Sequence, residues 1–265
     1  MTQLTDRVLS APEGLVGELV SLERRLAGSG VPVRVTWLNH HSIRIALAVA
    51  PEAVGQVDVC GIDGQFLQWL LRHPARTSAD LVVPRLLAAD PSIRTVLAIG
   101  GCGDRSDALT TALTREAGRP VAAICLDGFE DLPRGDRLRR LVRDVKPDLV
   151  LVGLGAGLQE QVLLEAASAM RRGYALTCGG FLDQVLQEGY YPGWAYPLKL
   201  NWLVRLAREP RRLWRRYTIE ALSAVGRRAD WRASMATVPG VAVHERMCVG
   251  GVVPRPRPAT DLGLA

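Results

Sequence analysis

The amino-acid sequence predicts an α/β fold with a mostly parallel, doubly wound sheet, followed by a basic and aromatic helical segment. Before residue 185, six short apolar runs alternate with helical patterns, as expected for strands that are covered on both faces. After residue 185 no strand pattern follows, and arginine and tryptophan become frequent. The 48% of hydrophobic residues and the mean hydropathy of +0.09 are typical of a globular protein.

Each element of the predicted sheet can be located in the sequence. The expected strands are 32–38, 56–62, 94–100, 119–126, 147–154 and 174–180. The expected helices between them are about 64–73, 80–90, 104–117, 134–145 and 157–172. This βαβα order favours a Rossmann-like sheet with parallel strands.

We expect three segments along the chain. Residues 1–184 form the Rossmann-like domain, 185–232 form a basic helical appendage, and 233–265 form a tail rich in proline and glycine. Within the appendage, Glu209-Pro210 should separate two short helices, because proline is tolerated in the first turn of a helix but not in its interior.

The net charge of +6 is concentrated in the appendage. Residues 199–232 contain ten basic and three acidic residues, so the rest of the chain is close to neutral. A local anionic partner is therefore expected.

Several classes of protein are disfavoured by the sequence. No run reaches the roughly 18 to 20 apolar residues of a membrane-spanning helix, and the N-terminus does not resemble a secretory signal, so we expect a cytoplasmic protein. The five cysteines are spread singly and predict neither disulfides nor a zinc site. The four histidines have no metal-binding spacing, and no D-x-D follows a strand, so no metal is demanded.

Glycine-rich loops follow the third and fifth expected strands, where parallel sheets bind ligands. Gly101 and Gly103 lie in "GGCGDRSD", and Gly155 lies in "GLGAGLQEQ". Such loops either cradle phosphate with backbone N–H groups or simply allow tight turns. The dinucleotide fingerprint G-x-G-x-x-G is incomplete in both loops.

Three polar residues follow strands at the same expected edge of the sheet. Asp63 is either a helix cap or a general base that takes a proton from a hydroxyl. Asn39 and Gln159 either bind sugar hydroxyls or satisfy local backbone groups.

The appendage places arginines beside aromatic residues. Arg212, Arg215 and Arg216 share one helical face beside Leu213, Trp214 and Tyr217. A solvated helix, a nucleic-acid surface and a membrane-surface element are the three alternatives, and we favour the last because aromatic residues accompany the arginines. The expected membrane contacts are Trp194, Trp202, Arg208, Arg211, Trp214 and Arg216.

The stretch "NWLVRLAREPRRLWR" at 201–215 resembles the C-terminal motif of the WecG/TagA/CpsF family of bacterial glycosyltransferases, with Asn201 in place of the usual glutamate. Upstream, the strand end at Asn39, Asp63-Gly64, "GAGLQE" at 155–160 and "GGFLD" at 179–183 are similar to family motifs in the same order. Trp37 replaces the family's threonine, and Gly157-Leu158 replaces its Pro-Lys.

The resemblance implies an inverting, metal-independent transferase without a cofactor, peripheral to the cytoplasmic face of the bacterial inner membrane. It implies a nucleotide sugar as donor and a polyprenyl-diphosphate-linked sugar as acceptor, and no nucleic acid. Asp63 would be the general base, and Arg205, Arg212 and Arg215 would bind diphosphate. The remaining substrate-binding residues would be Asn39, Gln159, Glu160, Gly101, Gly103 and Gly155.

The resemblance leaves the sugar open. The arginine-rich chain and the altered "GAGLQE" loop favour the exopolysaccharide branch, with a GumM-like, xanthan-type β-1,4-transfer of glucose from UDP-glucose. Transfer of N-acetylmannosamine or its uronate is the alternative within the family. An NAD-dependent oxidoreductase, with Asp127 as a candidate ribose-binding acid, and a nucleic-acid-binding protein are the alternatives of other classes.

Overall fold

The computed structural model describes most of the chain between residues 12 and 226. The described ranges are 12–71, 76–101, 103–128, 132–187, 190–193, 195, 197–198 and 200–226.

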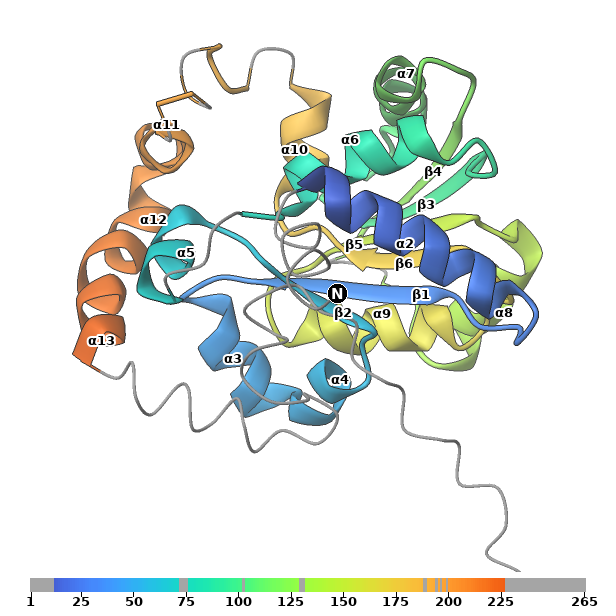
Figure 1. Ribbon diagram of the computed structural model, residues 1–265, viewed down its shortest axis with the longest axis horizontal. Helices are drawn as coiled ribbons and strands as arrows, with labels where there is room; N and C mark the ends of the chain where they lie inside the picture. The colour runs from blue at the N-terminus through green and yellow to red at the C-terminus, as the bar shows by residue number, and fades with distance from the viewer. Residues whose placement is uncertain are drawn as a thin grey trace, which may run out of the picture.

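The centre of the molecule is a six-stranded, all-parallel sheet (Figure 1). Its order is β2-β1-β6-β5-β3-β4. The strands are β1 (Val33–Leu38), β2 (Val59–Ile62), β3 (Thr95–Gly100), β4 (Ala122–Leu126), β5 (Leu149–Gly153) and β6 (Tyr174–Thr177). All six lie within the runs that predicted them, so the prediction of a parallel α/β sheet is confirmed.

Helices cover both faces of this sheet, as a doubly wound fold requires (Figure 1). One face carries α2 (Pro12–Ala27), α6 (Ala79–Ala89) and α7 (Ser106–Ala117). The other face carries α3 (Ser42–Val49), α4 (Pro51–Gly55), α8 (Asp136–Val145) and α9 (Leu158–Ala167). The five helices expected between strands are present, with α5 (Gln65–Leu71) following β2, while α2, α3 and α4 were not predicted.

Glycines let the loops at the carboxyl edge of the sheet approach one another closely. A Cβ on Gly100, whose φ is 144°, would lie 2.6 Å from the carbonyl oxygen of Gly153. A Cβ on Gly153 would lie 2.6 Å from the carbonyl oxygen of Gly179. The ends of β3, β5 and β6 are therefore packed backbone against backbone, which fixes the floor of the cavity described below.

The segment after β6 begins with α10 (Phe181–Leu186) and then forms a chain of short helices at the carboxyl edge of the sheet (Figure 1). These are α11 (Asn201–Arg208), α12 (Pro210–Arg215), the π-helix η1 (Arg216–Glu220) and α13 (Ala221–Gly226). The break at Glu209-Pro210 is where the sequence predicted it. The π-helical turn was not predicted, and it shifts the side chains that follow it relative to an α-helical register. The boundaries of the three segments stay predictions, and Trp194 and residues 227–265 lie outside the described residues.

Candidate active site

A cavity of about 640 Å³ opens at the carboxyl edge of the sheet. Residues that follow five of the six strands line it, together with residues from the helices after position 190. The cavity therefore lies where a parallel sheet is expected to bind its ligand. Its lining includes Asn39, Asp63, Gly101, Gly155, Gln159, Arg205 and Arg215, all expected from the sequence.

Asp63 and Asn39 are held together at the ends of β2 and β1. The side-chain nitrogen of Asn39 donates a hydrogen bond to Oδ2 of Asp63 over 3.1 Å. The carboxamide oxygen of Asn39 accepts from the backbone N–H groups of His41 and Ser42, at 3.1 Å and 2.9 Å. Asn39 is thus fixed by its own loop and orients the carboxylate of Asp63 toward the cavity.

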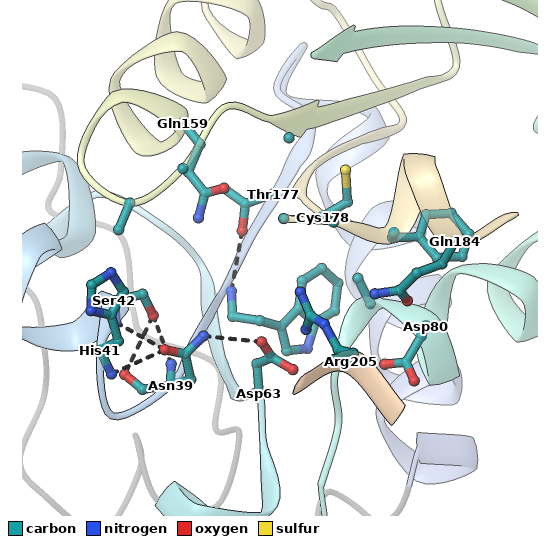
Figure 2. A pocket seen from close by; sticks show the side chains of 18 of the residues that line it. Asn39, His41, Ser42, Asp63, Asp80, Gln159, Thr177, Cys178, Gln184 and Arg205 are labelled. Carbon is teal, nitrogen blue, oxygen red and sulfur yellow. Dashed lines mark hydrogen bonds between the residues drawn. The ribbon is translucent and has the colours of Figure 1, made fainter. Parts of the chain in front are cut away.

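Arg205 reaches the same place from α11, and Figure 2 shows Asp63 between Asn39 and Arg205. Burial lowers the pKa of Arg205, but Tyr191, Tyr217 and Asp63 raise it, and the balance lies above the ordinary value. The guanidinium is therefore always positively charged. Its Nε is buried and finds no hydrogen-bond partner among the described residues, so the structure leaves a donor for a ligand.

Gln159 and Glu160 differ in their positions although they are neighbours. Glu160 is fully buried and accepts hydrogen bonds from the Thr36 hydroxyl at 3.0 Å and from the N–H of Gly157 at 2.7 Å. It also accepts from Nε2 of Gln159 at 2.9 Å. Gln159 lines the cavity, and its Oε1 is buried without a partner in the described part of the chain. Glu160 therefore fixes which atom Gln159 offers to a ligand.

The expected glycines also differ. Gly101 and Gly155 line the cavity, and Gly155 adopts a φ of 86°, which a side chain rarely allows. Gly103 adopts a φ of 50° and is not part of the cavity lining. As a substrate contact it remains a prediction, while its conformation gives it a role in the turn.

The remaining arginines and tryptophans of the appendage are in different surroundings. Arg215 is exposed and lines the cavity, whereas Arg208 lies over the ring of Tyr190, with Cζ 4.7 Å from the ring centre. Arg211 is exposed, and Trp202 and Trp214 are 38% and 49% exposed. Leu213 is only 1% exposed, so Trp214 does not share its inward direction. The side chains of Arg212 and Arg216 are outside the described part of the structure.

Several lining residues were not expected from the sequence. Thr177, Asp183, Tyr191 and Glu220 lie in the cavity wall. Glu220 contacts His41, with Oε2 2.5 Å from Nδ1, which joins η1 to the loop of Asn39. Thr177 ends β6 and Asp183 ends the "GGFLD" motif, but neither was expected in the site. No short motif marks Tyr191 and Glu220, because their position depends on how the appendage packs against the sheet.

The cavity wall also contains a cysteine thiol. Cys178 lines the cavity, but burial raises the pKa of its thiol, so the thiol stays protonated and is a poor nucleophile. In the described ranges, no three His, Cys, Asp or Glu side chains are grouped so that they could hold a metal ion.

The Trp37 indole is packed against Gly61 on the neighbouring strand. A Cβ on Gly61 would lie 2.4 Å from both Cδ1 and Nε1 of Trp37. We expect Gly61→Ala to lower the free energy of unfolding by about 1–3 kcal/mol, because the indole has to move. In a chain that carries Trp37→Thr the same change should cost less, because only the contact of the new Cβ with Oγ1 of Thr77, at 2.8 Å, remains. Calorimetric melting of the four proteins measures this coupling. If Gly61→Ala lowers the free energy of unfolding equally in the wild type and in Trp37→Thr, the contact is contradicted.

A parallel sheet with a carboxylate, a half-buried arginine and glycine-rich loops at its carboxyl edge defines an α/β protein with a ligand-binding cleft. The family model described as "Glycosyl transferase WecG/TagA/CpsF family" matches residues 15–236. The chain therefore belongs to the WecG/TagA/CpsF family of glycosyltransferases and is an enzyme. A search of curated protein sequences finds no significant match.

Proposed function

We propose that the protein is an inverting glycosyltransferase that moves a sugar from a nucleoside diphosphate to a sugar on a polyprenyl diphosphate. The observation that supports this most strongly is the meeting of Asp63, from the sheet, and Arg205, from the appendage, at one cavity. A base and a permanent cation are the two groups that such a displacement needs most.

The proposed reaction is a single displacement. Asp63 takes the proton of an acceptor hydroxyl, whose oxygen bonds to the anomeric carbon of the donor sugar. The bond from that carbon to the diphosphate oxygen breaks, and its electron pair leaves with the nucleoside diphosphate. Attack from the face opposite the leaving group inverts the anomeric carbon.

Arg205 neutralises the departing diphosphate in this proposal. Its side chain is half-buried, its guanidinium is positive at all physiological pH values, and its buried Nε finds no hydrogen-bond partner among the described residues. A guanidinium can bind two oxygens of a phosphate at once, which a lysine cannot. Arg212 and Arg215 would add positive charge, while Asn39, Gln159 and the loops of Gly101, Gly103 and Gly155 would hold the donor. Glu160 would contribute by orienting Gln159.

The appendage is proposed to bind the membrane surface. Of the ten large hydrophobic side chains described as exposed, seven lie between residues 198 and 225. They are Leu198, Trp202, Leu203, Trp214, Ile219, Leu222 and Val225. Arginines lie among them, which is the composition of an interfacial helix that meets anionic lipid.

No helix in the described ranges is long and apolar enough to span a bilayer. A peripheral position at the cytoplasmic face of the inner membrane, with Trp194, Arg208, Arg211 and Arg216 as further contacts, is part of the proposal.

Flotation with anionic vesicles measures this attachment. Ile219→Glu and Leu222→Glu replace side chains that are 53% and 75% exposed. We expect each to reduce vesicle binding by about tenfold, because a leucine or isoleucine that enters the interface is worth about 1.5–3 kcal/mol. Val49→Glu, at a residue of α3 that is 60% exposed, is the matched control and should bind as the wild type does. Equal losses in all three variants, or none, would contradict attachment through the appendage.

Among donors, we favour UDP-glucose with β-1,4-transfer in exopolysaccharide synthesis of the xanthan type, and N-acetylmannosamine or its uronate is the alternative. The full-length protein is incubated with polyprenyl diphosphate-glucose, a panel of nucleotide sugars and EDTA, and the product is identified by mass. A product that is one hexose heavier supports the proposal, and addition of an N-acetylhexosamine or its uronate selects the alternative. If no donor in the panel gives a product, the proposed transferase function is contradicted.

A further inference from the structure

A second hollow, of about 340 Å³, adjoins the main cavity. The two hollows have Asn39, Asp63, Arg76, Tyr191 and Arg205 in common. Asp63 therefore borders both hollows. We call this second hollow the aromatic pocket, because rings make up much of its wall.

The rings of the aromatic pocket come from both parts of the chain. The ring centres of His40 and Phe66 are 4.9 Å apart, and those of Phe66 and Trp69 are 5.9 Å apart. On the other side, Tyr217 is 5.9 Å from His40 and also 5.9 Å from Trp202. This chain of rings is a surface for a flat, partly apolar ligand, and the C–H face of a pyranose ring is such a surface.

Asn201 supplies the polar group of the pocket. It is the first residue of α11, it lines the pocket, and it is only 4% exposed. Neither its side-chain oxygen nor its nitrogen has a hydrogen-bond partner among the described residues. A buried amide without partners costs about 1–3 kcal/mol. A hydroxyl group that both donates and accepts would satisfy it, whereas a hydrocarbon chain would not.

We propose that the aromatic pocket binds the sugar ring of the acceptor and that Asn201 recognises one of its hydroxyl groups. This inference rests on the proposed function, because that function places the donor in the main cavity. It deepens that function by giving the acceptor sugar a site of its own, with the attacking hydroxyl facing Asp63. The prenyl diphosphate then extends from the pocket along the appendage toward the lipid.

Binding to the full-length protein tests this without any transfer reaction. The probes are n-hexyl glucoside and n-hexyl N-acetylglucosaminide, with n-hexanol and UDP as comparisons, and the signal is tryptophan fluorescence from Trp69 and Trp202. We expect saturable quenching by a glycoside, and about tenfold weaker binding in Asn201→Leu, because one hydrogen bond is lost. Gln161→Leu removes a carboxamide from α9 outside both hollows and should change nothing.

The melting temperature separates recognition from a structural role. Since the side chain of Asn201 has no hydrogen-bond partner among the described residues, Asn201→Leu should melt at the wild-type temperature or above it. A lower melting temperature with unchanged glycoside binding would overturn the proposal. So would quenching by n-hexanol equal to that by the glycosides, Asn201-dependent quenching by UDP, or no quenching by either glycoside. Asn201-dependent glycoside binding without transfer in the donor panel would contradict the proposed function and leave the sugar site standing.

Discussion

Asp63→Asn is expected to lower kcat for sugar transfer by about 10²- to 10⁴-fold, the usual contribution of a general base. The new carboxamide has the same shape, and its oxygen can still accept the hydrogen bond that Asn39 donates over 3.1 Å. The geometry of the loop should therefore survive, while the negative charge that takes the proton is lost. The release of nucleoside diphosphate at saturating donor and acceptor measures kcat.

The control for this variant is Asp136→Asn, at an exposed carboxylate at the start of α8. It should retain wild-type activity. Vesicle binding and the melting temperature of Asp63→Asn should match those of the wild type, since neither depends on the charge at this position. Full activity in Asp63→Asn would remove this residue as the base.

Arg205→Gln should reduce kcat by about 10²- to 10³-fold, the typical loss when one positioned donor to a developing anion is removed. Arg205→Lys keeps the charge but not the forked geometry, so its kcat should lie between that of the wild type and that of Arg205→Gln. The donor KM should change less than kcat, because the leaving diphosphate gains negative charge in the transition state. Steady-state kinetics with both substrates varied measures the changes in kcat and in the donor KM separately.

Arg171→Gln is the matched control, because Arg171 is exposed and lies outside both hollows. It should behave as the wild type does. A rise in the acceptor KM with unchanged kcat in Arg205→Gln would show that the guanidinium only binds substrate. Since Arg205 reaches the cavity from α11, such a result would also mean that this residue of the appendage does not contribute to the rate of the transfer step.

Much of the fold follows from the sequence because strands covered on both faces are short, apolar and β-branched. All six were predicted for this reason. The helix α2 carries a signal that the strand-based prediction did not use, since Leu15, Leu19 and Leu22 have helical spacing. The helices α3 and α4 are short and apolar, and periodicity alone cannot separate such segments from strands or loops.

Some residues of the candidate site could likewise be predicted from the sequence, and others could not. Asp63, Asn39 and Gln159 were predictable, because each follows a strand and the carboxyl ends of parallel strands share one edge. Arg205 came from the resemblance to the family. Asn201 is the first residue of the C-terminal motif, but its place in the aromatic pocket depends on the packing of the appendage. Glu220 depends also on the π-helical turn, and no local pattern in the sequence specifies its position.

We propose that the guanidinium of Arg205 takes the place of a metal ion beside the departing diphosphate. The most direct measurement is the initial rate of transfer by the full-length protein on vesicles containing the acceptor, with EDTA and with added Mg²⁺ or Mn²⁺. We predict the same rate in all three conditions and a large loss in Arg205→Gln in each of them. A rate that EDTA abolishes and a divalent cation restores would contradict the claim.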